Sequence, residues 1–202
     1  MKIILDLDGT LIDYRERAWN LFLLLTNGAC TRDFYFNQKS LGVSNHEILN
    51  NINKNVDWKE FDLHWRAKIE SVEYLEYDEI FDGLCEWLRK ANNQGNSLYL
   101  CTARRNRENL FSQLEKFKLI GFFTSIIVTY GNEKTTQLSK LLELEGAFDW
   151  IISDSPGDIK TGKKLGLRTC SVGTGFRSNE TLAKYLPDLN LASVLNFPYE
   201  HK

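Results

Sequence analysis

The stretch MKIILDLDGTLID, residues 1–13, places two carboxylates, Asp6 and Asp8, directly after a short apolar run. The run MKIIL has the length and composition of a buried strand. Side chains two residues apart in an extended chain point to the same side, so these two anions would face each other at short range. Asp and Gly also favour turns, but a paired repulsion of this kind indicates a functional site that holds a compensating cation.

Four further apolar runs follow beyond about residue 80, and segments with helical periodicity separate them. The runs are NSLYLCTA (96–103), SIIVTY (125–130), DWIISDS (149–155) and LRTCSVGTG (167–175). The helical segments are FDGLCEWLRKANNQG (81–95), NRENLFSQLEKFKLIG (106–121), KTTQLSKLLELEG (134–146) and DIKTGKKLGL (158–167). Strands that alternate with helices in this way are typical of an α/β fold with a buried parallel sheet, which the first run is expected to join.

The stretch between the first run and this alternating region is amphipathic and contains no strand of comparable quality. Its helical segments are RERAWNLFLLLTNG (15–28), SNHEILNNIN (44–53) and DWKEFDLHWRAKIESVEYL (57–75). We therefore predict a Rossmann-like core formed by residues 1–13 and 83–202, with residues 14–82 inserted as a helical cap over the sheet.

Composition limits the function classes. The chain has 202 residues and a formal net charge of −2, so no overall field favours a nucleic-acid or membrane partner. The basic segment TARRNRE (102–108) lacks the interleaved aromatic residues of a nucleic-acid patch, and AWNLFLLL (18–25) is too short to span a bilayer. The four cysteines are widely separated and lack metal-ligand spacing. A reducing, cytoplasmic compartment is the default expectation.

Open parallel sheets bind ligands beyond the carboxyl ends of their strands, so the residues that end these runs are expected to lie together. Those residues are Asp6, Asp8, Gly9, Thr10, Thr102, Ala103, Arg104, Asp154, Ser155, Gly157 and Asp158. Four carboxylates at one edge need a cation, and oxygen ligands without His or Cys favour Mg²⁺ over zinc. Each part alone has a simpler explanation: Thr102 as a helix N-cap, SDSPGD as a helix start, Lys134 as a solvated lysine.

Taken in chain order, these segments resemble the motifs of the haloacid dehalogenase superfamily of phosphatases and related hydrolases. DLDGT (6–10) resembles the first motif, CTAR (101–104) the second, Lys134 the third and SDSPGD (153–158) the fourth. The resemblance implies a Rossmann-like core, and the stretch between the first two motifs looks like the helical cap of the common cap-bearing members.

The resemblance also implies roles for individual residues. Asp6 would be the nucleophile that forms an aspartyl-phosphate, and Asp8 the acid and base. The phosphate-binding candidates are Gly9, Thr102, Ala103, Arg104 and Lys134. The implied Mg²⁺ ligands are Asp6, the carbonyl of Asp8, and Asp154, with Asp158 as an outer ligand or a support for Lys134.

Two positions depart from the usual family pattern: Ser153 stands where Gly is common, and Thr135 follows the lysine where Pro is common. The second departure leaves Lys140 as a competitor for the role of Lys134, although only Lys134 begins the helix.

The expected activity is Mg²⁺-dependent hydrolysis of a small-molecule phosphate monoester. A phosphomutase on the same scaffold and a non-enzymatic binding or regulatory module are the alternatives. The substrate and the oligomeric state are not readable from the sequence. Cap residues that could reach the site are Lys39, His46, Lys54, His64, Trp65 and Arg66.

Overall fold

The computed structural model describes residues 1–52, 56–131 and 134–199. A six-stranded parallel sheet forms its centre, in the order β5-β4-β1-β6-β7-β8. The strands are β1 (Lys2–Leu5), β4 (Ser97–Thr102), β5 (Ser125–Val128), β6 (Trp150–Ser153), β7 (Arg168–Val172) and β8 (Leu189–Leu191). The predicted α/β class with a Rossmann-like parallel sheet is confirmed.

Strand β1 lies in the middle of the sheet. Ile3 is in register with Leu98 of β4 on one side and with Trp150 of β6 on the other. Its residues Ile3, Ile4 and Leu5 are fully buried, because helices cover both faces. Asp6 follows directly, and its backbone N–H donates to the Ile152 carbonyl at 3.0 Å, so the sheet pairing continues up to the first carboxylate.

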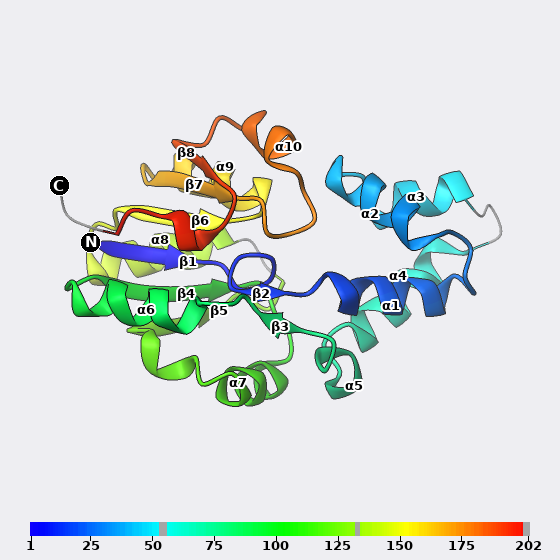
Figure 1. Cartoon of the computed structure of the whole chain (residues 1–202), viewed down its shortest axis with the longest axis horizontal. Helices are drawn as coiled ribbons and strands as arrows, with labels where there is room; N and C mark the ends of the chain where they lie inside the picture. Colours follow the sequence, from blue (N-terminus) through cyan, green and yellow to red (C-terminus); the bar gives the residue numbers. More distant parts are fainter. Residues whose placement is uncertain (53–55, 132–133, 200–202) are drawn as a thin grey trace.

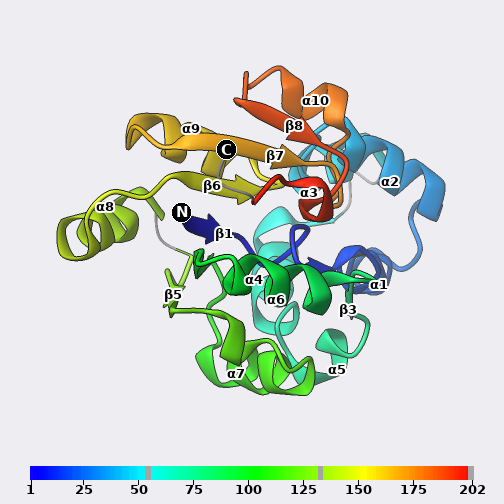
Figure 2. The same cartoon turned by 60° about the vertical axis from the view of Figure 1, so that its left-hand side comes forward.

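Helices α6 (Leu84–Asn93) and α7 (Arg107–Lys116) cover one face of the sheet, and α8 (Lys134–Glu145) and α9 (Pro156–Lys164) the other (Figure 2). Leu88 of α6 and Leu110 of α7 join Ile3 and Leu5 in the larger core cluster. Leu138 of α8 packs with the opposite face in a second cluster. The four helices match the four helical segments predicted from periodicity.

In the described residues, five helices lie between the two strands of a short antiparallel ribbon, β2 (Ile12–Asp13) and β3 (Glu79–Ile80). They are α1 (Arg15–Leu25), α2 (Arg32–Ser40), α3 (Asn45–Ile52), α4 (Trp58–Lys68) and α5 (Val72–Leu75). In Figure 1 they lie beyond the carboxyl ends of the strands. Phe22, Tyr35 and Phe61 form a separate apolar cluster there, which Phe176 from the β7–α10 loop completes.

Several elements differ from the predictions. Strand β8, helix α2 and helix α10 (Asn179–Ala183) were not predicted, and neither were the short 3-10 helices Ile120–Phe122 and Val194–Asn196. The single helix predicted for residues 57–75 is two helices, α4 and α5, separated at Ile69–Ser71. The insertion was predicted to lack strands, but β3 lies within it and pairs with β2.

No helix in the described part of the chain is long and apolar enough to cross a membrane. All four cysteines are free thiols; Cys101 and Cys170 are buried, and Cys30 and Cys85 are half-buried.

Candidate active site

A cavity of about 610 Å³ opens at the carboxyl ends of the strands. Most of the strand-end residues predicted from the sequence line its wall, together with Lys134 at the start of α8: Asp6, Asp8, Thr102, Ala103, Arg104, Asp154, Ser155, Gly157 and Asp158. Gly9 is not among the lining residues, and its N–H donates to the Ile12 carbonyl at 2.7 Å. The cavity size is in the range of sites for small ligands.

Lys134 joins two of the carboxylates. Its Nζ lies 2.7 Å from Asp6 Oδ1 and 2.6 Å from Asp158 Oδ2, and the lysine side chain is largely buried. Burial raises the pKa of Asp6 to about 6, against the opposing charge of Lys134. Burial alone would lower the pKa of Lys134, but Asp6 and Asp158 beside it outweigh that effect and raise it. Lys140, by contrast, is exposed on α8.

Ser153 contributes a hydroxyl to the same group, at the position where the family often has Gly. Its Oγ lies 3.2 Å from Asp6 Oδ2 and 2.7 Å from Asp158 Oδ2, and its single hydrogen can be donated to one of them at a time. The side chain therefore orients the nucleophile candidate instead of interfering with it.

Asp154 is a buried carboxylate whose oxygens receive no hydrogen bond or ion pair from the described residues. Its backbone N–H donates to Thr10 Oγ1 at 3.1 Å, which ties the fourth motif to the first. A Cβ on Gly9 or Gly175 would stand 2.3 or 1.8 Å from Asp154 Oδ2, so only glycines allow these two loops to approach the carboxylate.

This carboxylate supports a metal site. Burial, together with Asp6 and Asp158, raises the pKa of Asp154 well above its ordinary value, so a cation is needed to keep it ionised. Three or more His, Cys, Asp or Glu side chains do not cluster as a metal site anywhere in the described residues. The ligands that remain are the carboxylates of Asp6 and Asp154 and the Asp8 carbonyl, an all-oxygen set that fits Mg²⁺ with several retained waters.

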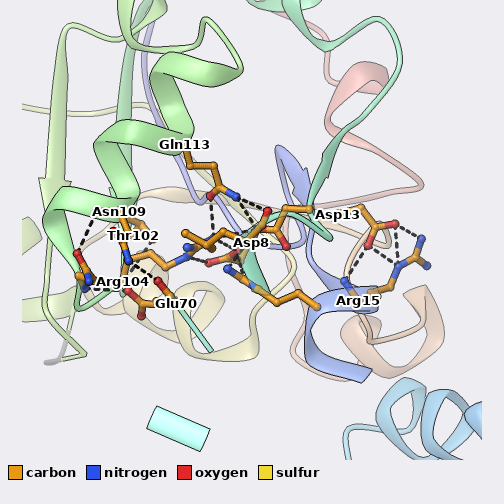
Figure 3. A network of polar contacts seen from close by, with 12 residues as sticks. Asp8, Asp13, Arg15, Glu70, Thr102, Arg104, Asn109 and Gln113 are labelled. Carbon is orange, nitrogen blue, oxygen red and sulfur yellow. Dashed lines mark hydrogen bonds and ion pairs between the residues drawn. The ribbon is translucent and has the colours of Figure 1, made fainter. Parts of the chain in front are cut away.

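Asp8 lies between two guanidinium groups (Figure 3). Arg104 Nε and Nη2 donate to its two oxygens at 2.6 and 2.7 Å, and Arg17 Nη2 donates at 2.6 Å. Burial alone would raise the pKa of Asp8, but Arg104 and Arg17 hold it well below its usual range. Both arginine side chains are almost fully buried, so this is a pairing within the protein and not a solvated surface contact.

Asp78 and Gln113 complete this network. Asp78 Oδ2 lies 3.1 Å from Arg17 Nη1 and 3.3 Å from Arg104 Nη2, and it accepts a hydrogen bond from Gln113 Nε2 at 2.8 Å. Burial raises the pKa of Asp78 to about 6 despite the two guanidiniums. The two carboxylates, Asp8 and Asp78, and the two guanidinium groups, Arg17 and Arg104, together carry no net charge. They connect the first motif with α1, the segment before β3 and the second motif.

Sequence reasoning did not find Arg17, Asp78 or Gln113, because none of them ends a strand or belongs to a motif.

Thr102 is buried at the cavity wall, and its Oγ1 lies 3.4 Å from the Arg104 backbone N–H. Among the cap candidates, Trp65 lines the cavity and Lys54 lies outside the described residues.

The family model for haloacid dehalogenase-like hydrolases matches residues 3–172. The chain therefore belongs to this family of hydrolases, and the resemblance inferred from its four motifs is confirmed. The match covers the parallel sheet through β7, the helical insertion and every predicted site residue.

Solved structures with the same fold include a haloacid dehalogenase-like hydrolase from Streptococcus pneumoniae, with a TM-score of 0.77, 18% identity, and coverage of 95% of this chain and 93% of that one. A predicted phosphatase from Clostridium acetobutylicum has a TM-score of 0.74 and 20% identity, with 96% and 94% covered. A Thermotoga maritima protein provisionally named β-phosphoglucomutase has a TM-score of 0.68 and 16% identity, with 95% and 94% covered. No curated protein matches the sequence.

Proposed function

We propose that this hydrolase is a Mg²⁺-dependent phosphatase that cleaves a small phosphate monoester through an aspartyl-phosphate on Asp6. The observation that carries this proposal is the Asp6 carboxylate, held by Lys134 at 2.7 Å on the wall of the cavity with the unpaired Asp154 carboxylate beside it. An ionised carboxylate is a nucleophile that needs no base, and a buried ammonium group offsets the charge of an incoming phosphate.

The reaction has two steps. A carboxylate oxygen of Asp6 forms a bond to phosphorus, while the bond from phosphorus to the ester oxygen breaks and the alcohol leaves with a proton from Asp8. Water then attacks the phosphorus and restores the Asp6 carboxylate, and Asp8 takes the proton from that water. Lys134 and Thr102 hold phosphoryl oxygens in both steps. The bound Mg²⁺ would supply electrostatic stabilisation of the phosphate and of its ligands Asp6, Asp154 and the Asp8 carbonyl.

The two arginines on Asp8 affect these steps differently. Their hydrogen bonds favour the carboxylate form, which is the protonation state needed to accept a proton from water, but they also lower its basicity. Donation of a proton to the leaving alcohol requires that at least one of these hydrogen bonds is released first. Arg17 belongs to α1 of the insertion, which we propose is a cap domain spanning residues 14–82 that moves on the β2–β3 ribbon.

The proposal is tested with a panel of phosphate monoesters that includes p-nitrophenyl phosphate and sugar phosphates, with phosphate release and product identity both measured. Release of inorganic phosphate supports a phosphatase, whereas an isomeric sugar phosphate without phosphate release identifies a phosphomutase. Absence of turnover with every ester would favour a binding or regulatory module and overturn the proposal.

Removal of divalent ions with EDTA is expected to lower the rate by at least about 100-fold, and Mg²⁺ should restore it. Calcium should bind and inhibit, because it readily accepts both oxygens of one carboxylate and would occupy the Asp6 oxygen needed for attack. A metal titration of the stripped protein provides the measurement. Equal rates with calcium and magnesium, or full activity without either, would contradict the assigned ligand set.

Lys134→Ala is expected to reduce kcat by about 10² to 10³-fold, since it removes a charge that stabilises the phosphoryl group. Lys140→Ala is the matched control, because that lysine lies on the same helix but is exposed. It should leave kcat unchanged. Steady-state kinetics of both purified variants decides the prediction, and a comparable loss in Lys140→Ala would show that the lysine role is assigned wrongly.

A further inference from the structure

A second cavity, of about 350 Å³, lies next to the candidate active site; we call it the side chamber. Tyr14, Trp65 and Arg177 line both cavities, so the two spaces meet at these three side chains. The remaining wall of the side chamber comes mainly from cap helices and includes Lys39 of α2 and Phe176 of the β7–α10 loop. Its volume suits part of a small ligand.

Backbone contacts bring the two cations of the side chamber together. Ser178 N–H donates to the Ser40 carbonyl at 3.1 Å, and Thr181 Oγ1 donates to the same carbonyl at 2.9 Å. Each of the two cations directly precedes one of these residues, Lys39 before Ser40 and Arg177 before Ser178. The end of α2 is therefore fixed against the start of α10 with both positive side chains at the chamber wall.

Neither cation forms a salt bridge with a carboxylate of the described residues, and only longer-range attraction acts between Arg177 and Asp154 and between Lys39 and Glu47. Lys39 Nζ lies over the Phe176 ring at 5.6 Å, and no carboxylate pairs with it. Two carboxylates of this region have partners of their own: Asp62, which lines the side chamber, pairs with Arg66 Nε at 2.6 Å, and Glu47 accepts from Ser44 Oγ at 2.7 Å. Burial, together with the charge of Arg177, lowers the pKa of Lys39 to about 8. Two neighbouring cations that form no salt bridge are suited to bind an anion.

Aromatic side chains form much of the remaining wall of the side chamber, beside polar residues that include Ser44, Asn45 and Asp62. Tyr14 stands edge-on to Phe176 with ring centroids 5.3 Å apart, and Trp65 stacks on Phe61 at 5.6 Å. Tyr14 and Trp65 line the junction of the two cavities together with Arg177, whereas Lys39 lines only the side chamber. A ligand that extends from the catalytic cavity through this junction would pack a short carbon skeleton on the rings and place its second anion between Arg177 and Lys39.

We propose that the side chamber binds the alcohol portion of the substrate, and that Lys39 and Arg177 bind a second anionic group, a carboxylate or a second phosphate, on that portion. The proposal rests on the phosphatase function and narrows its substrate class to phosphate monoesters that carry another anion. The phosphate at Asp6 and the distal anion would then be recognised by different cations: Lys134 for the first, Lys39 and Arg177 for the second.

Matched substrates test this. In the first pair, 3-phosphoglycerate carries a carboxylate where glycerol 3-phosphate has a hydroxymethyl group. In the second pair, 1,3-propanediol bisphosphate carries a second phosphate that 3-hydroxypropyl phosphate lacks. We expect kcat/KM to be about 10- to 100-fold higher for the member that carries the second anionic group in at least one pair, mainly through KM. The pair with the larger ratio identifies the distal anion.

Lys39→Met and Arg177→Met should each bring the ratio of kcat/KM values within that pair to within about threefold of one. Lys59→Met, a change at an exposed lysine of α4, is the control and should preserve the ratio. Thermal unfolding verifies that each variant is folded, and Lys39→Gln is the substitute if the Met variant is not.

The outcomes separate the two proposals. If no ester is hydrolysed, including p-nitrophenyl phosphate, the phosphatase function itself fails. If p-nitrophenyl phosphate is hydrolysed but both ratios are close to one in the unmodified protein, the side chamber does not select a second anion and only this inference fails. A high ratio that persists in both Met variants would also overturn it, because other groups would then bind the distal anion.

Discussion

Asp6→Asn is expected to reduce turnover by at least about 10⁴-fold while the fold remains intact. The amide cannot form the aspartyl-phosphate, and it is a poorer metal ligand than the carboxylate. The hydrogen-bond partners of the side chain are Lys134 Nζ at 2.7 Å and Ser153 Oγ at 3.2 Å, and an amide oxygen can still accept from one of them. The measurement is single-turnover and steady-state phosphate release by the purified variant.

The stability of Asp6→Asn should equal or exceed that of the unmodified protein at pH 7. Burial raises the pKa of Asp6 from 3.8 to about 6, so folding favours its protonated form; the resulting loss of stability develops as the pH rises from 3.8 to about 6 and is complete at pH 7. Asparagine removes this cost, and Lys134 keeps Asp158 at 2.6 Å as a counter-ion. Substantial activity in a well-folded Asp6→Asn protein would refute the assignment of the nucleophile.

Arg104→Met is expected to lower the free energy of unfolding by about 3–5 kcal/mol at neutral pH. The substitution removes two hydrogen bonds from Asp8 and leaves Asp8 and Asp78 with Arg17 as their shared cation. Arg15→Met is the control, because Arg15 pairs with Asp13 at 2.5 Å in a half-exposed position, where an ion pair contributes about 1 kcal/mol or less. Urea denaturation of both variants gives the comparison.

The effect of Arg104→Met should depend on pH. Because Arg104 and Arg17 hold the pKa of Asp8 below its ordinary 3.8, Asp8 contributes stability above that value, and the contribution is lost as the pH falls further. The difference between the variant and the unmodified protein should therefore be largest near pH 7 and shrink in acid. Equal unfolding free energies for Arg104→Met and the unmodified protein at pH 7 would show that the network is not a stabilising unit.

The main fold and much of the site are predictable from the sequence because parallel strands place their carboxyl ends together. Asp6, Thr102 and Asp154 each follow a clear apolar run, and all three line one cavity. Strand β8 has three residues, one of them Asn190, and carries too little periodicity to be recognised. The β2–β3 ribbon has two residues in each strand, and its pairing depends on where the insertion begins and ends.

The network around Asp8 illustrates what local patterns omit. Arg17 and Asp78 are far apart in sequence and become neighbours because the β2–β3 ribbon brings the two ends of the insertion together. Arg104 was predicted to bind phosphate because it follows a strand; its side chain lines the cavity but is hydrogen-bonded to Asp8, and its phosphate contact stays a prediction. A charged residue at a motif position therefore does not reveal which residue it pairs with or where its side chain points.

The central position of β1 has a consequence for synthesis on the ribosome. The strands that flank it, β4 and β6, begin only at Ser97 and Trp150, so β1 and the Asp6 that follows it leave the exit tunnel well before either neighbour. The helices between β2 and β3 make local contacts and can collapse in that interval, whereas the sheet depends on distant pairings that form slowly. The nascent chain thus carries β1 without its sheet neighbours until Ser97 and later Trp150 have emerged, and Asp6 can meet Lys134 only after that lysine has been made.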